Sequence, residues 1–291
     1  MQTAWCSQNT AWKKGDAGIM IYFLLTLNFL LMIVLPLLLG IWLVHRYKVS
    51  WLLFIIGAAG FIVSQIGHLP FNRFVLNPFI AGYMGPGETA VSHFIAALLL
   101  GLSAGVFEEV TRYLFYTFRK SMRRWDEGLM FGAGWGGVEA IILGVLAATT
   151  LINIYIYQSG LIETLVPAGQ AAASAEAIAT AAQQIEALLN APLYTFILGA
   201  VERVFALILH LSLSILVLQA FLRRSIIWLL AAIGWHAAAN TVAVFGALQG
   251  WDPLLIEALL GVAALISFLI IRAFRPQEAS LAAAPAEGWT E

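Results

Sequence analysis

The chain has 291 residues, of which 61% are hydrophobic and 11% are charged, and its formal net charge is −1. Soluble domains carry about a quarter charged residues, so this composition predicts an integral membrane protein. The near-neutral charge, together with the lack of a basic cluster mixed with aromatic residues, excludes nucleic-acid binding. The single cysteine, Cys6, excludes an internal disulfide and a cysteine-rich zinc site, which leaves histidines and carboxylates as metal ligands.

Seven apolar runs are long enough to cross a bilayer, whose ~30 Å core takes roughly 20 helical residues. They are Ile19–Val44, Trp51–Phe71, Val91–Phe118, Gly128–Tyr157, Leu193–Leu222, Ile226–Leu248 and Leu254–Ile271. The first run is too long for a signal-peptide core, so we expect it to stay as an anchor. The sequence therefore predicts an all-α, polytopic helix bundle in the inner or plasma membrane, with residues 19–272 as a single domain.

Basic residues predict the orientation of the chain. Ten of them follow the first, third, fifth and seventh runs and fall on one side of the bilayer: Arg46, Lys48, Arg119, Lys120, Arg123, Arg124, Arg223, Arg224, Arg272 and Arg275. The opposite side has only Lys13, Lys14 and Arg73. By the positive-inside rule, the N-terminal segment 1–18 lies outside and the C-terminus lies in the cytoplasm.

Three segments outside the apolar runs have recognisable compositions. Residues 72–90 contain Pro78, Pro86 and three glycines, which predicts an outer loop. Residues 160–190 carry a weak helical stripe, which predicts an interfacial helix that is either a lid over a site or, more simply, a passive connector. Residues 273–291 are rich in alanine, proline and glutamate, which predicts a disordered tail.

Two acids and a base interrupt the third apolar run, at Glu108, Glu109 and Arg112. An ionised side chain at the centre of a membrane helix costs roughly 2.5–3.5 kcal/mol, so these three require partners or water. Gly101 and Gly105 continue the helical face of Glu108 and Arg112. This small and polar face is expected to look into the bundle, where it marks a candidate functional site.

Other spans carry polar residues at a similar depth. These are Glu139 in the fourth span, Glu202, Arg203 and His210 in the fifth, and His236 and Asn240 in the sixth. At ~1.5 Å per residue, Glu109, Glu139, His210 and His236 all lie some 15–20 Å from the cytoplasmic charges. Arg203 is expected to pair with Glu139 or Glu202 further toward the outside, whereas His45 and His68 lie near span ends and are expected to be interfacial.

These residues allow three kinds of site. Two histidines and a carboxylate, here His210, His236 and Glu109, are the ligand set of a catalytic zinc, and a second carboxylate is left to accept a proton from bound water. The same residues also serve as hydrogen-bonded links that hold helices together. A proton-coupled transporter uses buried Glu, Arg and His as well, although the chain shows no internal repeat of the kind common in such carriers.

The order of the motifs resembles YhfC-type intramembrane metalloproteases. It consists of Glu-Glu-x-x-Arg-Tyr from Glu108, Gly-x-Gly-x-Gly-Gly-x-Glu-Ala from Gly132, Glu-Arg at 202–203 with a histidine seven residues after the arginine, and His-x-x-x-Asn from His236. An earlier Ser-Gln-x-x-His-x-Pro, at 64–70, is similar too, and the likeness extends from Trp51 to about Phe245. That group is similar in turn to the CAAX-processing and bacteriocin-processing (CPBP) superfamily of membrane proteases.

The resemblance implies a peptidase that hydrolyses a membrane protein or peptide with a Glu-activated, His-held water, with or without zinc. Its implied site residues are Glu108 or Glu109 as the catalytic carboxylate, Arg112 as its positioning partner, and His210, His236 and Asn240 around the water or metal, with Glu139, Glu202, Arg203 and Trp135 surrounding them. Trp135 stands where we expect a histidine in the group's glycine-rich segment, so we expect sub-stoichiometric or exchangeable zinc. Because the superfamily includes non-catalytic members, the resemblance also allows a membrane scaffold that binds a partner.

Overall fold

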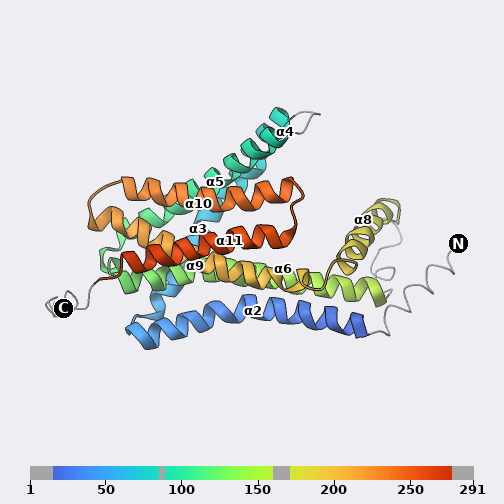
Figure 1. Ribbon diagram of the computed structural model, residues 1–291, viewed down its shortest axis with the longest axis horizontal. Helices are drawn as coiled ribbons and strands as arrows, with labels where there is room; N and C mark the ends of the chain where they lie inside the picture. Colours follow the sequence, from blue (N-terminus) through green and yellow to red (C-terminus); the bar gives the residue numbers. More distant parts are fainter. Residues whose placement is uncertain (1–15, 85–88, 160–170, 277–291) are drawn as a thin grey trace. The chain divides into compact units, whose positions relative to one another are not determined.

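The computed structural model describes residues 16–84, 89–159 and 171–276, and all regular secondary structure in them is helical (Figure 1). The α-helices are α2 (Asp16–Tyr47), α3 (Trp51–Phe71), α4 (Asn77–Met84), α5 (Ala90–Phe118), α6 (Trp125–Ser159), α8 (Ala171–Leu189), α9 (Thr195–Leu222), α10 (Ile227–Leu248) and α11 (Pro253–Ala273). Residues 1–15 of the predicted outer segment, 160–170 of the predicted outer connector and 277–291 of the predicted tail lie outside the described residues.

Seven stretches in the described part of the chain are long and apolar enough to cross a membrane, which confirms the prediction of a seven-span helical protein. Their helices begin and end within a few residues of the apolar runs, and α3 coincides with its run from Trp51 to Phe71. Polar N-caps lie at the start of several of them. Thr89 and Ser92 form a reciprocal capping box at the start of α5, and Asp252 caps α11 ahead of Pro253. Which side of the membrane each terminus faces stays a prediction.

The prediction of a loop after α3 was wrong for residues 72–84. Asn72–Leu76 form a π-helical turn and Asn77–Met84 form α4, so the second span continues to Tyr83. Proline inside a regular α-helix clashes with the carbonyl four residues before it, and the widened π-helical turn ends at Leu76, two residues before Pro78. The apolar residues of this segment, among them the buried Leu76 and Ile80, favour continuing the helix over ending it.

The chain divides into two compact units, Met1–Leu35 with Ala140–Val204, and Pro36–Glu139 with Phe205–Glu291. The first, which we call unit 1, contains α8 and parts of α2, α6 and α9. Its core consists of Ile21, Leu25, Ile154 and Phe196. The buried amide of Asn28 on α2 accepts a hydrogen bond from the backbone N–H of Ala200 on α9, at 2.7 Å. The helix predicted within residues 160–190 is present as α8, and its place at the outer interface stays a prediction.

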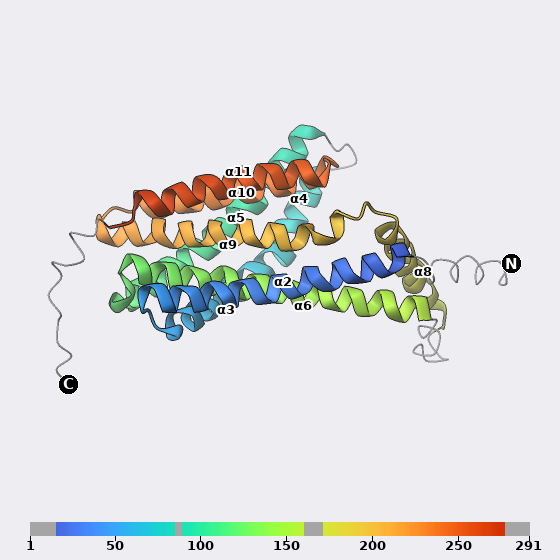
Figure 2. The same ribbon diagram turned by 60° about the horizontal axis from the view of Figure 1, so that its bottom comes forward.

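The second unit, which we call unit 2, contains α3, α4, α5, α10, α11 and the remaining parts of α2, α6 and α9. Its core is formed largely by residues 129–135 of α6 and 209–218 of α9. In unit 2, α5 packs against α3 and α10, and α10 lies beside α11 in both views (Figure 1, Figure 2). The prediction that residues 19–272 form one domain stays a prediction.

Glycines bring the helices of unit 2 close together. A Cβ atom on Gly134 of α6 would lie 1.9 Å from the carbonyl oxygen of Phe54 on α3, and one on Gly57 of α3 would lie 2.0 Å from that of Phe131. On α5, a Cβ atom on Gly101 or Gly105 would lie 2.6 or 2.7 Å from a carbonyl oxygen of α10. The backbones therefore touch at these positions, which leaves the polar side chains of α5 within reach of α3, α6 and α10.

Candidate functional site

The centre of the site is a buried ion pair on α5. Glu109 and Arg112 are both inaccessible to solvent, and Arg112 Nη1 donates to Glu109 Oε2 at 2.8 Å. The other oxygen of Glu109 lies 2.8 Å from Nδ1 of His236 on α10. A carboxylate buried without partners would be very costly, and here each of its oxygens faces a donor.

The partners of His236 determine where its proton lies. An ionised carboxylate only accepts hydrogen bonds, so Nδ1 of His236 carries the hydrogen that Glu109 accepts. In neutral His236 the lone pair is therefore on Nε2, which makes no hydrogen bond with the described part of the chain. A carboxylate that orients an imidazole in this way leaves the far nitrogen available as a base.

His210 on α9 has a different environment. Arg112 Nη2 lies 3.2 Å from His210 Nδ1, and because a guanidinium only donates, Nδ1 is the acceptor. Its Nε2–H then donates to Glu139 Oε2 on α6, at 2.7 Å. The rings of His210 and His236 are near each other, with centroids 5.5 Å apart and planes at 83°. His210 is thus a neutral link between α5 and α6, with both nitrogens engaged.

Glu108 is held by neutral donors. Trp135 Nε1 donates to one of its oxygens at 2.9 Å, and Gln65 Nε2 donates to the other at 3.2 Å. The indole of Trp135 also lies 4.4 Å below the guanidinium carbon of Arg112, in a cation–π contact. Gly60 on α3 makes room for this ring, because a Cβ atom there would lie 2.6 Å from it.

A chain of hydrogen bonds leads away from Glu108 along α3. Gln65 Oε1 lies 3.2 Å from His68 Nδ1, and His68 Nε2 lies 3.0 Å from the amide nitrogen of Asn72. Ser103 on α5 donates to Asn72 Oδ1 at 2.7 Å. Because the amide N–H of Asn72 donates to Nε2, His68 donates through Nδ1 to the amide oxygen of Gln65.

This chain corrects the expectation that His68 is interfacial. Its side chain is buried and stacks on Phe107, with ring centroids 5.5 Å apart. The sequence contained a usable signal, because Gln65, His68 and Asn72 are spaced three and four residues apart. This spacing places three polar side chains on one face of an apolar helix.

Three other predicted site residues, Asn240, Glu202 and Arg203, take no part in the hydrogen bonds described above. Asn240 follows His236 by one turn on α10, is half-buried, and makes no hydrogen bond with the described residues through its side chain. Glu202 and Arg203 belong to unit 1, where they form an ion pair with each other, one of the two pairings that the sequence allowed.

The described residues do not fit the predicted zinc site. No group of three or more His, Cys, Asp or Glu side chains among them is arranged to hold a metal ion. The hydrogen bonds explain this: Nδ1 of His210 faces a guanidinium, its Nε2 carries a hydrogen, and both oxygens of Glu109 face donors. Of the four histidine nitrogens, only Nε2 of His236 has a lone pair that no hydrogen bond engages, whereas a catalytic zinc takes three protein ligands.

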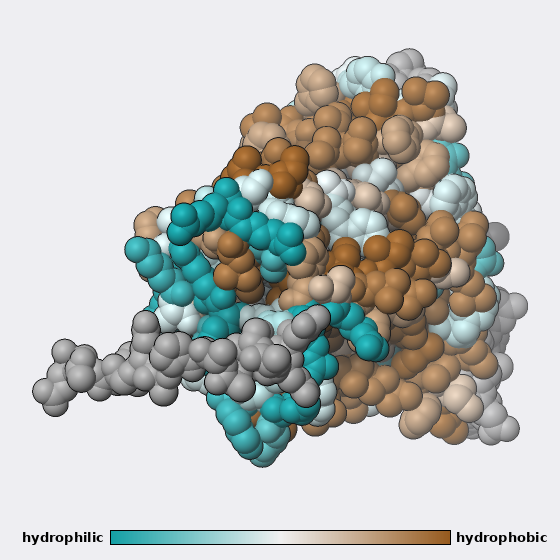
Figure 3. All heavy atoms as spheres, turned by 60° about the vertical axis from the view of Figure 1, so that its left-hand side comes forward, coloured by the Kyte–Doolittle hydropathy of each residue, from teal (hydrophilic) through white to brown (hydrophobic). Residues whose placement is uncertain are grey.

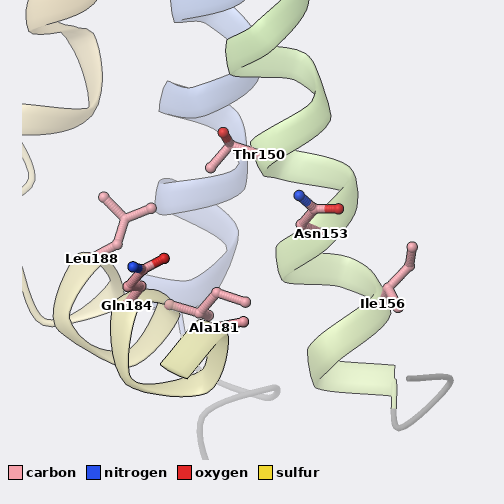
Figure 4. Close-up of a pocket in the computed structure, with 7 residues that line it drawn as sticks. Thr150, Asn153, Ile156, Ala181, Gln184 and Leu188 are labelled. Carbon is pink, nitrogen blue, oxygen red and sulfur yellow. The ribbon is translucent and has the colours of Figure 1, made fainter. Parts of the chain in front are cut away.

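Unit 1 contains a cavity of about 410 Å³ between α6 and α8. Thr150, Asn153 and Ile156 line it from α6, and Ala181, Gln184 and Leu188 line it from α8 (Figure 4). Its walls carry amide and hydroxyl groups but no charged side chain. It therefore offers shape without the acid, base or metal ligands that catalysis requires.

The fold and the site together define a polytopic membrane protein with a polar centre of carboxylates, arginine and histidines inside its spans. A family model described as YhfC intramembrane metalloprotease matches residues 31–275, so the chain belongs to this family. It is also 34% identical over 214 residues to the uncharacterized membrane protein YhfC of Bacillus subtilis (strain 168), a match that covers 72% of this chain and 79% of that protein. No solved structure matches the chain. These findings confirm the resemblance seen in the motifs.

Proposed function

We propose that the protein is an intramembrane peptidase in which His236, oriented by Glu109, deprotonates the water that attacks a peptide bond. The observation that carries this proposal is the 2.8 Å contact between His236 Nδ1 and Glu109, which leaves Nε2 with an unused lone pair. The family's description as an intramembrane metalloprotease supports the reaction class.

The proton transfers follow from this geometry. A water proton moves to Nε2 of His236 while the water oxygen bonds to the peptide carbonyl carbon, and the carbonyl oxygen becomes an oxyanion. The ionised Glu109 stabilises the imidazolium. The oxyanion then re-forms the carbonyl, the C–N bond breaks, and the imidazolium gives its Nε2 proton to the leaving amine nitrogen. General acid–base catalysis of this kind contributes typically about 10²–10⁴-fold to a rate.

Asn240 is suited to stabilise the oxyanion. It lies one helical turn from His236, and its amide is free to donate because no described residue accepts from it. A donor aimed at a developing oxyanion is worth about 10²–10³-fold in rate. Arg112 has a different role, because its hydrogen bonds go to Glu109 and His210, so it positions these two groups.

The two carboxylates divide the work in this proposal. Glu109 contacts the base, whereas Glu108 contacts Trp135 and Gln65, which favours Glu109 as the carboxylate of the reaction and Glu108 as an anchor for α3 and α6. The donor set around the two histidines does not fit zinc, so no step of the proposed mechanism passes through a metal ion.

The reaction is tested with purified protein in liposomes that contain a library of apolar, membrane-inserting peptides, in water enriched in ¹⁸O. Hydrolysis places ¹⁸O in the new C-terminal carboxylate of a product, which mass spectrometry detects. We expect Asn240→Ala to lower the rate by about 10²-fold, because it removes the oxyanion donor, and to leave thermal stability unchanged. Asn153→Ala in unit 1 is the matched control and should retain the wild-type rate.

A non-catalytic scaffold is the second candidate. The observation in its favour is that the polar atoms of the site largely satisfy one another, which links α3, α5, α6, α9 and α10 in the manner of a structural network. If no peptide gains ¹⁸O with the wild-type protein while the chain remains folded, the scaffold is favoured and the peptidase proposal fails. The proton-coupled carrier would instead be shown by a pH-dependent solute flux into the same liposomes.

A further inference from the structure

A second cavity, of about 480 Å³, lies in unit 2 away from the buried glutamates and histidines. It forms where α2 ends, α6 begins, α9 ends and the chain leaves α11. All four places are ends of membrane-spanning helices, on the side that the basic residues predict to be cytoplasmic. The cavity therefore lies at the level where the headgroups of a bilayer meet the helix ends.

The walls of this cavity are strongly basic. They include Arg46, Arg123, Arg124 and Arg275, against the single carboxylate of Asp126. Arg124 is neutralised locally by Asp126, through hydrogen bonds of 3.1 Å from Nε and 2.7 Å from Nη2. Arg123 donates through Nε and Nη2 to the carbonyl oxygen of Tyr116. An excess of positive charge remains, and it favours an anionic ligand.

Arg46 and Arg275 are the arginines most available to such a ligand. Both are exposed, and neither forms an ion pair with the described residues. The guanidinium carbon of Arg46 lies 5.3 Å from the ring centroid of Tyr47, and that of Arg275 lies 5.9 Å from the ring centroid of Trp125. These contacts hold the two charges beside the cavity and leave their N–H groups free to donate.

The surroundings favour a lipid over a soluble anion. Leu222 lines the cavity and is 55% exposed, and α11, whose end borders the cavity, carries the exposed apolar residues Leu265, Phe268 and Leu269. Hydrophilic residues gather on the side of the molecule where α11 ends, next to a surface of hydrophobic residues (Figure 3). A ligand with a charged head and acyl chains matches both surfaces, and Tyr47 and Trp125 are the residue types that favour the interface between them.

We propose that this cavity binds the phosphate of an anionic phospholipid, with Arg46 and Arg275 as its principal ligands. Basic pockets between membrane helices on the cytoplasmic side are suited to phosphate headgroups, and guanidinium groups bind phosphate oxygens in bidentate fashion. The acyl chains lie along the exposed apolar residues of α9 and α11. This site is independent of the proposed peptidase reaction.

Native mass spectrometry of the detergent-purified full chain tests the proposal, with dioleoylphosphatidylglycerol, dioleoylphosphatidylcholine and glycerol 3-phosphate as probes. We expect saturable retention of one phosphatidylglycerol, at least about tenfold tighter than retention of phosphatidylcholine, because one basic residue near an anionic lipid contributes about fivefold. Arg46→Gln with Arg275→Gln should weaken it about thirtyfold. The matched control is Arg119→Gln with Lys120→Gln, which removes two exposed charges on the same side but outside the cavity.

The outcomes are distinct. Equal loss of phosphatidylglycerol in the control pair would show attraction to surface charge in general and overturn the site. Retention of glycerol 3-phosphate as tight as that of the lipid would overturn the assignment to a lipid. Should the double variant melt at a lower temperature than wild type in phosphatidylcholine, Arg275→Gln alone, which lies beyond the last turn of α11, takes its place with an expected loss of about fivefold.

Discussion

At the scale of single residues, the direction of each hydrogen bond separates two histidines that look alike in the sequence. His210 accepts from Arg112 and donates to Glu139, so it has no nitrogen left for chemistry. His236 donates to Glu109 and keeps the lone pair of Nε2. The difference arises because arginine can only donate and a carboxylate can only accept.

The hydrogen bonds of His210 and Glu109 predict the zinc content of the purified protein. We expect less than one zinc per chain in protein purified without chelator, because His210 and Glu109 would each have to break hydrogen bonds to buried charged partners before binding a metal. Elemental analysis of wild type beside His210→Ala and His236→Ala is the measurement. A full equivalent of zinc in wild type that both substitutions remove would contradict the prediction.

His68 provides a second prediction at this scale. Replacing it with phenylalanine keeps a ring against Phe107 but leaves Gln65 and Asn72 without their partner. We expect His68→Phe to lower the free energy of unfolding by about 1–3 kcal/mol, the usual cost of buried polar groups left unpaired. His45→Phe is the matched control, since His45 is exposed near the end of α2, and it should change stability by less than about 0.5 kcal/mol. Equal shifts in melting temperature for the two variants in detergent would contradict the buried position of His68.

At the scale of helices, glycine spacing determines which elements meet. The Gly101 and Gly105 face of α5, which the sequence predicts to look into a bundle, packs against the backbone of α10. The glycine-rich segment of α6 has two sides: Gly134 and Gly137 contact Phe54 on α3, whereas Gly132 and Gly136 contact His210 and Ser214 on α9. Small residues therefore bring the charged residues of α5 close to both histidines.

The close approach of α5 and α10 is tested by a pair of glycine substitutions. A Cβ atom on Gly105 would lie 2.7 Å from the carbonyl oxygen of Ile233, so Gly105→Ala has to push α10, and His236 with it, away from Glu109. We expect a loss of about 1–3 kcal/mol of stability, the usual cost of overpacking. Gly234→Ala on α10 is the control, because a Cβ atom there meets nothing within 4 Å, and it should be neutral or stabilise by up to about 1 kcal/mol. Similar melting shifts for both would contradict the packing.

At the scale of the whole molecule, the arrangement of the chain across the bilayer follows from the basic residues. We expect reporter fusions at position 174 to face the outside, and fusions at position 125 or after position 275 to face the cytoplasm. Alkaline phosphatase and green fluorescent protein fusions measure this directly. A cytoplasmic reporter at position 174 would reverse the orientation, and it would place the arginine-lined cavity on the outer surface.

The seven spans and the polar residues inside them are predictable from the amino-acid sequence alone. Both follow from the bilayer, because a spanning helix needs about 20 apolar residues and an ionised side chain inside the hydrocarbon core costs free energy unless it has a partner or water. The order of the motifs in the sequence also identified the family, which the comparison with known proteins confirmed. These are one-dimensional properties, readable without knowing which helices touch.

Which atoms of those residues meet depends on how the helices pack in three dimensions. The rotation and packing of α3, α5, α6, α9 and α10 place Glu109 against His236, commit His210 to Arg112 and Glu139, and bring Gln65 and His68 to Glu108. Spacing along one helix predicts which side chains lie on the same face of that helix. It does not predict which residues of another helix pack against that face. The continuation of α3 through a π-helical turn, where prolines and glycines predict a loop, likewise depends on burial of Leu76 and Ile80 against the start of α5.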